Sequence, residues 1–156
     1  MSTEKHDPTC IIFDIDGSIA NCDHRVHHVR NKPKNWKEFK KGIPNDTVYH
    51  DIIWMLKTFA SQGIIILIAT GRDEDDREAT EIWLRDVAKI DGIYSKLYMK
   101  KANDFRPDTV TKLEMLKKMR EDGFNPTIAL DDRPSVIKLW RDQGLTTLAV
   151  GPLEHF

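Results

Sequence analysis

The sequence predicts a three-layer α/β/α sandwich built on a mainly parallel, Rossmann-like sheet. Short apolar runs alternate with longer amphipathic segments along the chain. Parallel strands need crossover connections, so this alternation is typical of a parallel sheet covered by helices on both faces. Polar residues directly follow three of the apolar runs, and the carboxyl ends of parallel strands meet at one edge of a sheet. We therefore expect one functional site at that edge.

The composition limits the class of protein. The chain has 156 residues, and we expect one domain over residues 1–156 with a real core. A formal net charge of −1 favours neither a strongly basic nucleic-acid binder nor an acidic tail protein. The two cysteines form no CxxC pair, which favours free thiols in a reducing compartment. Since residues 1–8 lack a signal-peptide core and no apolar run is long enough to span a membrane, we expect a cytoplasmic protein with no membrane partner.

The first apolar run, Thr9 to Asp14, predicts a buried strand. Asp16 follows two residues after Asp14, and Gly17 then lets the backbone turn. Two neighbouring carboxylates repel each other and are costly to desolvate, unless a cation and a chemical task hold them there. Asp and Gly are also common turn formers, so a plain polar turn is an equal alternative from this motif alone.

A basic segment follows this turn. Between Arg25 and Lys41, seven Lys or Arg residues accompany a single acid, and Trp36 and Phe39 are interleaved with them. We interpret residues 21–46 as a small flap or cap insert over the site that attracts anions; a solvated charged face is the alternative. The two aromatic residues either stack on a nucleobase or form the small core of the flap.

The next two elements are a helix and a strand. The amphipathic spacing of Thr47 to Gln62 predicts a helix, with Asn45 or Asp46 as its N-cap. Ile64 to Ala69 is a continuous apolar run, which is typical of a strand buried on both faces. It ends in a predicted polar turn, Thr70-Gly71-Arg72.

The second half of the chain continues the alternation. An acidic run, Asp73 to Asp76, suits the first turn of a helix whose expected buried side carries Ala79, Ile82, Trp83 and Val87. The remaining elements are, in order, a strand over Ile93 to Met99, a helix over Asp108 to Asp122, a strand over Thr127 to Leu130, a helix from Pro134 to Gly144 and a strand over Thr146 to Val150. Asp131-Asp132-Arg133 is the third polar strand end.

Carboxylates, a threonine hydroxyl and basic side chains at one edge suit a magnesium-assisted phosphoryl site. Mg²⁺ prefers hard oxygen ligands, and with Arg and Lys it neutralises the transferring phosphoryl group. Asp14 is the candidate nucleophile, and Asp16 is the candidate general acid and base. The chain has no GxxxxGKS/T motif, which argues against a P-loop kinase. A zinc site is not favoured, because His24, His27 and His28 have no fourth ligand or Cys pair.

Four motifs follow one another along the chain: Asp14-Ile15-Asp16-Gly17-Ser18, Thr70-Gly71-Arg72, Lys112 and Asp131-Asp132. In this order and spacing they resemble the signature motifs of the haloacid-dehalogenase (HAD) superfamily of phosphatases. Ser18 replaces the commoner Thr and keeps the hydroxyl. The resemblance extends from Thr9 to Val150 and implies the HAD-like fold.

A narrower likeness involves Arg106 to Lys112, and also Leu130 to Arg133 followed by Val136 and Leu139-Trp140-Arg141. These segments resemble the 3'-phosphatase module of phage-type polynucleotide kinases, here without a kinase domain. The resemblance implies an aspartyl-phosphate intermediate on Asp14, with Asp16 as acid and base. It implies a magnesium ion held by Asp14, the Asp16 carbonyl, Asp131 and Asp132. It also implies phosphate contacts from Thr70, Gly71, Arg72, Lys112 and Arg25, with support from Asp108 (orienting Lys112), Asp132 and Arg133.

Several of these residues have plainer alternatives. Asp108 and Asp132 are each placed to cap a helix, and Arg133 is suited to a structural contact. Lys112 alternatively lies on a helix surface, in which case Lys100 and Lys101 are the spare candidates for the phosphate contact.

The function expected first is a Mg²⁺-dependent phosphomonoesterase that removes a terminal phosphate, with the 3'-phosphate of a polynucleotide as the first candidate. A 5'(3')-nucleotidase, or a phosphatase for another small phosphoester, is the alternative within the same chemistry, because fold and catalytic set do not fix the substrate. A non-catalytic nucleic-acid-binding subunit of a repair kinase or ligase is the alternative from a different class. A separate kinase or ligase is the expected type of partner.

Overall fold

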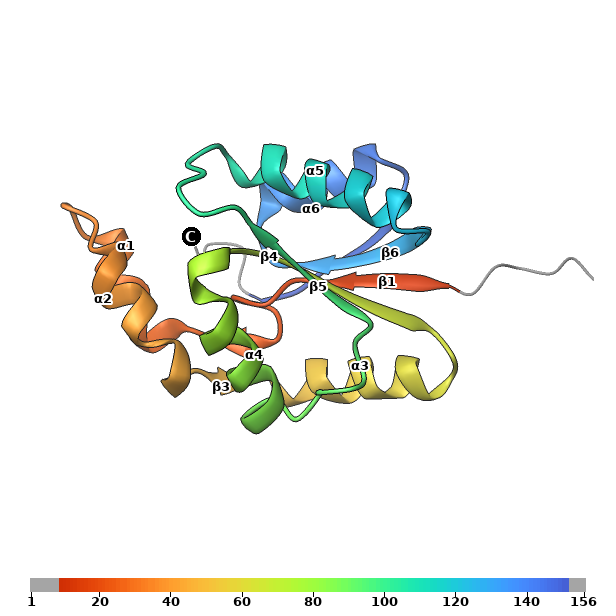
Figure 1. The fold of residues 1–156 in the computed structure, drawn as a ribbon, viewed down its shortest axis with the longest axis horizontal. Coiled ribbons are helices and arrows are strands. Elements are labelled where there is room, and N and C mark those ends of the chain that lie inside the picture. The colour runs from red at the N-terminus through yellow and green to blue at the C-terminus, as the bar shows by residue number, and fades with distance from the viewer. Residues whose placement is uncertain (1–8, 152–156) are drawn as a thin grey trace, which may run out of the picture.

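A five-stranded parallel sheet lies between two helical layers in the computed structural model, which describes residues 9–151 (Figure 1). The strands of this sheet are β1 (Cys10–Phe13), β4 (Ile65–Asp73), β5 (Lys96–Lys100), β6 (Pro126–Asp131) and β7 (Thr146–Ala149). Their order is β5-β4-β1-β6-β7, and every neighbouring pair is parallel. The predicted three-layer α/β/α sandwich is thus confirmed. The predicted absence of a signal-peptide core concerns residues 1–8, which lie outside the described residues.

Two helices cover each face of the sheet. They are α3 (His50–Ser61) and α4 (Arg77–Asp86) on one face, and α5 (Asp108–Glu121) and α6 (Pro134–Asp142) on the other (Figure 1). Along β1, Ile11 and Phe13 join the core cluster beneath α3 and α4, whereas Cys10 and Ile12 join the cluster beneath α5 and α6. Burial on both faces explains why the central strands read as unbroken apolar runs.

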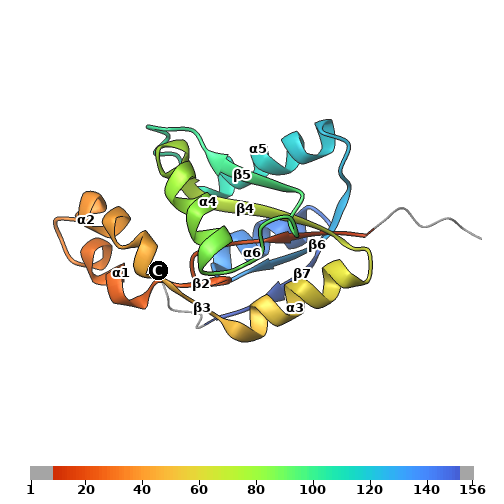
Figure 2. The ribbon, with the colours of Figure 1, turned by 60° about the horizontal axis from the view of Figure 1, so that its bottom comes forward.

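Most of the chain between β1 and α3 lies outside the sandwich, although Ile15, Ile19 and Ala20 join its core. This part of the chain forms α1 (Asp23–Arg30), α2 (Trp36–Lys41), the 3₁₀ helix η1 (Ile43–Asn45) and an antiparallel ribbon of β2 (Ala20–Asn21) and β3 (Thr47–Val48). We call residues 21–46 the cap segment. In both views it lies at the end of the molecule opposite to the start of β1 (Figures 1 and 2). Lys40 ties it to the sandwich, with Nζ 2.8 Å from Asp73 and 3.3 Å from Asp76.

Three predicted boundaries are wrong. The strand predicted over Ile93 to Met99 is β5, which begins only at Lys96 because residues 93–95 form a turn. The predicted helix over Thr47 to Gln62 begins only at His50, because Thr47 and Val48 pair with β2 instead. Tyr49 is the N-cap residue, and neither Asn45 nor Asp46 caps this helix. The turn predicted at Thr70-Gly71-Arg72 is also absent, since β4 continues to Asp73 through a register shift after Thr70. Such a bulge re-aims side chains at the end of a strand.

The buried face of α4 also differs from the predicted one. Thr80, Trp83 and Leu84 are buried, whereas Ile82 and Val87 are 42% and 39% exposed. Trp83 sets the rotation of the helix, because its indole N–H donates to the Asp46 carbonyl at 2.9 Å. No helix among the described residues is both long and apolar enough to cross a membrane.

Candidate active site

The carboxyl ends of β1 and β6 bring two buried aspartates to one buried lysine. Lys112 Nζ, on α5, lies 2.8 Å from Asp14 Oδ1 and 2.8 Å from Asp131 Oδ2, although 98 residues separate Lys112 from Asp14. The backbone N–H groups of Asp132 and Arg133 donate to Asp131 Oδ1 at 2.9 and 3.1 Å. The Asp131 carboxylate is therefore fixed in position from both sides.

Three carboxylates gather at this point. One oxygen from each of Asp14, Asp131 and Asp132 lies within 4.8 Å of the others, and all three residues are buried. Asp132 Oδ2 is buried and has no hydrogen-bond partner among the described residues. Gly17 makes room for it: a Cβ added there would lie 2.0 Å from Asp132 Oδ2, and the φ of Gly17 is +85°.

The charges of this cluster are not balanced by the protein alone. Burial, together with repulsion from Asp131, holds the pKa of Asp14 well above its usual range, even though Lys112 lowers it. Burial and the neighbouring Asp131 also raise the pKa of Asp132. Asp131 and Asp14 keep Lys112 charged despite its burial, raising its pKa. The three carboxylates offer hard oxygen ligands, and Asp132 Oδ2 is buried without a partner among the described residues. This arrangement fits a Mg²⁺ ion, whose charge keeps such carboxylates ionised.

A second cluster holds Asp16 between two arginines. Arg72 on β4 donates to Asp16 Oδ1 through Nη2 at 2.6 Å, and Arg25 on α1 does so through Nη2 at 3.0 Å. Both guanidinium groups also bind Asp46 Oδ2, at 3.1 Å from Arg72 and 2.7 Å from Arg25. Burial acts to raise the pKa of Asp16, but the two arginines outweigh it and the pKa lies below its usual range.

Asp46 is the residue of this cluster that the sequence did not predict as part of a site. Its side chain is fully buried, and Arg25 Nε donates a further hydrogen bond to Oδ1 at 2.7 Å. His24 also contacts Oδ1, at 2.7 Å. Asp46 is an acidic residue at the end of a basic segment, and this was the one sequence feature that could have indicated its role. Because Asp46 also precedes a predicted helix, an N-cap was the simpler interpretation.

The remaining candidates are placed as follows. Ser18 Oγ lies 3.4 Å from Asp14 Oδ2, and Thr70 Oγ1 accepts from the backbone N–H of Arg72 at 3.1 Å. Asp108 accepts a hydrogen bond from Arg133, whereas Lys112 donates to Asp14 and Asp131. Neither Asp108 nor Asp132 accepts a side-chain capping bond, because the N-cap residues of α5 and α6 are Pro107 and Arg133. Gly71 packs against Asp108: a Cβ added there would lie 3.3 Å from its carboxylate oxygens.

The sequence matches one family model over nearly its whole length. The model of the polynucleotide kinase PNKP phosphatase domain covers residues 8–154. The chain belongs to this family. Membership in the PNKP phosphatase family, which is a branch of the HAD phosphatases, supports hydrolysis of phosphoesters and agrees with the buried aspartates at the ends of β1 and β6.

Relatives of this PNKP phosphatase domain occur within larger proteins. A chain in the solved structure of the Pnkp1/Rnl/Hen1 RNA repair complex is 26% identical, with a TM-score of 0.76 over 96% of this chain and 44% of that chain. A protein of Autographa californica nuclear polyhedrosis virus, described as a bifunctional polynucleotide kinase/RNA ligase, is 25% identical over 90% of this chain and 19% of its own length. The PNKP phosphatase domain thus spans less than half the length of these relatives.

A more distant structure shares the fold. A haloacid dehalogenase-like hydrolase from Streptococcus pneumoniae has a TM-score of 0.66 at 15% identity, covering 91% of this chain and 84% of that chain. At this identity the likeness concerns the fold alone, and it agrees with the parallel sheet and its two helical layers.

Proposed function

We propose that this domain is a Mg²⁺-dependent phosphomonoesterase that removes the 3'-phosphate from the end of a polynucleotide. The observation that carries the proposal is the buried cluster of Asp14, Lys112, Asp131 and Asp132 in a chain that matches the PNKP phosphatase family over residues 8–154. One relative belongs to an RNA repair complex and another is described as a polynucleotide kinase/RNA ligase, which supports a polynucleotide rather than a metabolite as substrate.

The proposed metal site consists of Asp14, Asp131 and Asp132, with the backbone carbonyl of Asp16 as a further ligand. When bound, Mg²⁺ supplies positive charge that keeps the carboxylates ionised and offsets the charge of the phosphoryl group. Lys112 already lies between Asp14 and Asp131 and provides part of this charge. The pKa of Asp14 is raised, so an ionised nucleophile needs both cations.

Asp14 is the proposed nucleophile. One of its carboxylate oxygens forms a bond to phosphorus while the bond between phosphorus and the 3' oxygen breaks, which gives an aspartyl-phosphate. Asp16 donates a proton to the leaving 3' oxygen. Water then attacks the phosphorus of the aspartyl-phosphate, Asp16 takes up the proton, and Asp14 and inorganic phosphate are released.

Arg25 and Arg72 link substrate binding to the protonation of Asp16. While both guanidinium groups bind Asp16, its pKa is lowered and it is ionised. A phosphate group competes for the same guanidinium groups, and losing them raises the pKa of Asp16 towards values that suit a proton donor. Thr70 and the Gly71 backbone, at the bulged end of β4, are the proposed neutral phosphate contacts.

We propose that the cap segment, residues 21–46, partly covers the site as an insert within one domain. We also propose that a separate kinase or ligase acts beside this domain, because the longer relatives are a chain of an RNA repair complex and a protein described as a polynucleotide kinase/RNA ligase.

The decisive experiment measures phosphate release from four substrates, with Mg²⁺ and then with EDTA. The substrates are an oligonucleotide with a 3'-phosphate, the same oligonucleotide with a 5'-phosphate, a set of mononucleotides and p-nitrophenyl phosphate. We expect release mainly from the 3'-phosphorylated oligonucleotide, and loss of release in EDTA. Equal or faster release from mononucleotides would instead assign a nucleotidase.

The variant Asp14→Asn tests the nucleophile. It keeps the shape of the side chain but removes the nucleophilic charge, so turnover is expected to fall below detection while the melting transition remains cooperative. Exposed Asp75→Asn is the matched control and is expected to keep full activity. Retained turnover in Asp14→Asn would exclude the aspartyl-phosphate route.

A further inference from the structure

An exposed aromatic ring, that of Phe105, lies on a turn between β5 and α5 that is held by hydrogen bonds. Phe105 is 90% exposed, although the residues on either side of it are fixed. Arg106 donates to Asp104 Oδ1 through its backbone N–H at 3.1 Å and through Nε at 2.9 Å. Arg106 Nη1 also donates to Glu114 Oε1, on α5, at 2.7 Å. The turn therefore presents a large apolar ring to solvent from a fixed backbone.

A second exposed aromatic ring lies on the cap segment. Trp36 is 52% exposed, and its ring meets that of Phe39 edge-on, with 5.8 Å between centroids. Phe39 is buried and lies under the Arg25 guanidinium at 4.2 Å, so it forms the core of the cap segment. Of the two aromatic residues that the sequence offered for stacking, only Trp36 retains a large accessible surface.

Trp36 is connected to the catalytic cluster by contacts, and Phe105 is close in sequence to the helix that carries Lys112. The path from Trp36 runs through Phe39 to Arg25, which donates to Asp16 at 3.0 Å. Phe105 lies three residues before Asp108, the first residue of the helix that carries Lys112. In both views, the loop from β5 to α5 and the cap segment lie at the same end of the molecule (Figures 1 and 2).

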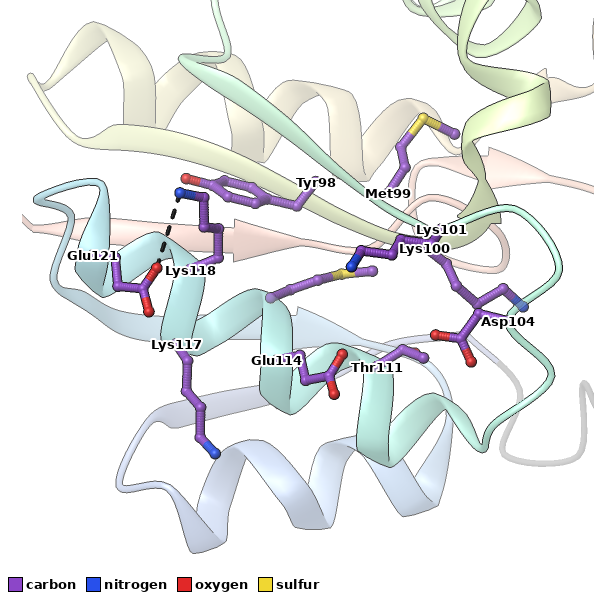
Figure 3. Close-up of a pocket in the computed structure, with 11 residues that line it drawn as sticks. Tyr98, Met99, Lys100, Lys101, Asp104, Thr111, Glu114, Lys117, Lys118 and Glu121 are labelled. Carbon is purple, nitrogen blue, oxygen red and sulfur yellow. Dashed lines mark ion pairs between the residues drawn. The ribbon is translucent and has the colours of Figure 1, made fainter.

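Basic side chains accompany each ring. Lys34 Nζ lies 5.6 Å from the centre of the Trp36 ring, and Lys37 is an exposed residue of the same helix as Trp36. Lys100 and Lys101 precede the Phe105 turn. Figure 3 shows them beside Asp104, at the end of a cavity of about 390 Å³ away from Tyr98. Arg106 neutralises Asp104 at that end.

We propose that Trp36 and Phe105 are two stacking platforms for bases of the single strand whose terminal phosphate enters the site. An aromatic ring stacks on any base, while lysines nearby bind the backbone phosphates. Bases within a duplex are already stacked on each other, and a mononucleotide has only one base. Two platforms on different elements therefore fit an unpaired polynucleotide end. The inference rests on the proposed 3'-phosphatase function and specifies its substrate as single-stranded.

The test compares Trp36→Ala, Phe105→Ala and the double variant with the unchanged protein. For each, kcat/KM is measured with a single-stranded 3'-phosphorylated oligonucleotide and with p-nitrophenyl phosphate. We expect the ratio of the two values to fall about tenfold in each single variant, as the loss of one stacked base predicts. Trp54→Ala is the matched control, because Trp54 is 68% exposed on α3, and its ratio is expected to stay unchanged.

Two further arms separate stacking from loss of structure. Trp36→Phe and Phe105→Tyr keep a ring and are expected to restore most of the ratio. An oligonucleotide without its last two bases is expected to be processed equally by the unchanged protein and the double variant. Ratios that stay unchanged in both alanine variants, or that fall equally with this abasic oligonucleotide, would overturn the inference. If the unchanged protein does not act on the 3'-phosphorylated oligonucleotide at all, the proposed function itself fails.

Discussion

Asp46 connects three parts of the molecule through one residue. Its carboxylate binds Arg25 from the cap segment and Arg72 from β4, and its backbone carbonyl accepts the indole N–H of Trp83 on α4. Both arginines also hold Asp16. Asp46 is thus a positioning residue in this arrangement: it fixes the two groups that set the orientation and the charge of the proposed acid.

Asp46→Asn is expected to lower both stability and turnover. The change leaves two buried guanidinium groups facing a neutral amide, and removing one partner of a buried ion pair costs about 3–5 kcal/mol. We expect the free energy of unfolding in urea to fall by about 3 kcal/mol, and kcat to fall with it. Asp86→Asn, which breaks an exposed pair with Arg85, is the control and should change neither quantity. Normal stability of the Asp46 variant would show that Asp16 alone compensates the charges of the two arginines.

Gly17 and Gly63 form a matched pair for testing the room around Asp132. Their φ angles are +85° and +81°, but a Cβ at Gly17 would meet Asp132 Oδ2 at 2.0 Å whereas one at Gly63 meets nothing within 4 Å. A left-handed alanine costs about 1–2 kcal/mol at either position, and the overlap with Asp132 adds to this cost in Gly17→Ala alone. Only Gly17→Ala is expected to abolish Mg²⁺-dependent phosphate release. Equal activity in the two variants would contradict the role of Gly17 in placing Asp132.

At the scale of elements, periodicity predicted the strands better than the helix faces. The apolar runs of β1 and β4 were located correctly because burial on both faces leaves little room for polar residues. The rotation of α4 was not predictable, since it depends on the contact between Trp83 and Asp46 across the chain. The start of α3 was missed for a similar reason: Thr47 and Val48 pair with a two-residue strand that no local pattern marks.

The observed rotation of α4 and the apolar sequence pattern lead to opposite predictions about which substitution on this helix lowers stability. Ile82 is 42% exposed and Leu84 is fully buried, although the apolar pattern placed Ile82 inward. Ile82→Lys is expected to change the free energy of unfolding by less than about 0.5 kcal/mol. Leu84→Ala is expected to lower it by about 2–5 kcal/mol. Urea denaturation of both variants decides between the two rotations, and a larger loss for Ile82→Lys would favour the pattern.

At the scale of the whole molecule, the sequence predicted which strand ends converge but not how their side chains pair. The convergence of Asp14, Arg72 and Asp131 follows from three strands, β1, β4 and β6, ending at one edge of a parallel sheet. The hydrogen bonds of Lys112 to both Asp14 and Asp131 could not be predicted, because they depend on how α5 packs against the sheet. The pairing of Arg25 and Arg72 with Asp46 required the fold of the cap segment, which sequence spacing does not specify.

Mg²⁺ is expected to stabilise the whole domain. Binding to the folded state alone adds about 1.4 kcal/mol at ten times Kd, which corresponds to roughly 3–6 °C in Tm for a domain of this size. The pKa values of Asp14 and Asp132 are raised, so these groups favour the folded state when protonated and cost stability as pH rises. The gain in Tm from Mg²⁺ should therefore grow as pH rises. Asp132→Asn should remove most of it, and an unchanged gain would contradict this metal site.

The central position of β1 has a consequence for synthesis on the ribosome. β1 is made first among the sheet strands, yet one of its two neighbours, β6, is made only after α5. Until then, one edge of the nascent strand has no partner, and such an intermediate is prone to aggregate or to need a chaperone. Contacts between residues that are far apart in the sequence also form slowly. We expect enzymatic activity to appear only after the Asp131 segment leaves the exit tunnel, so turnover would report that β6 has paired with β1.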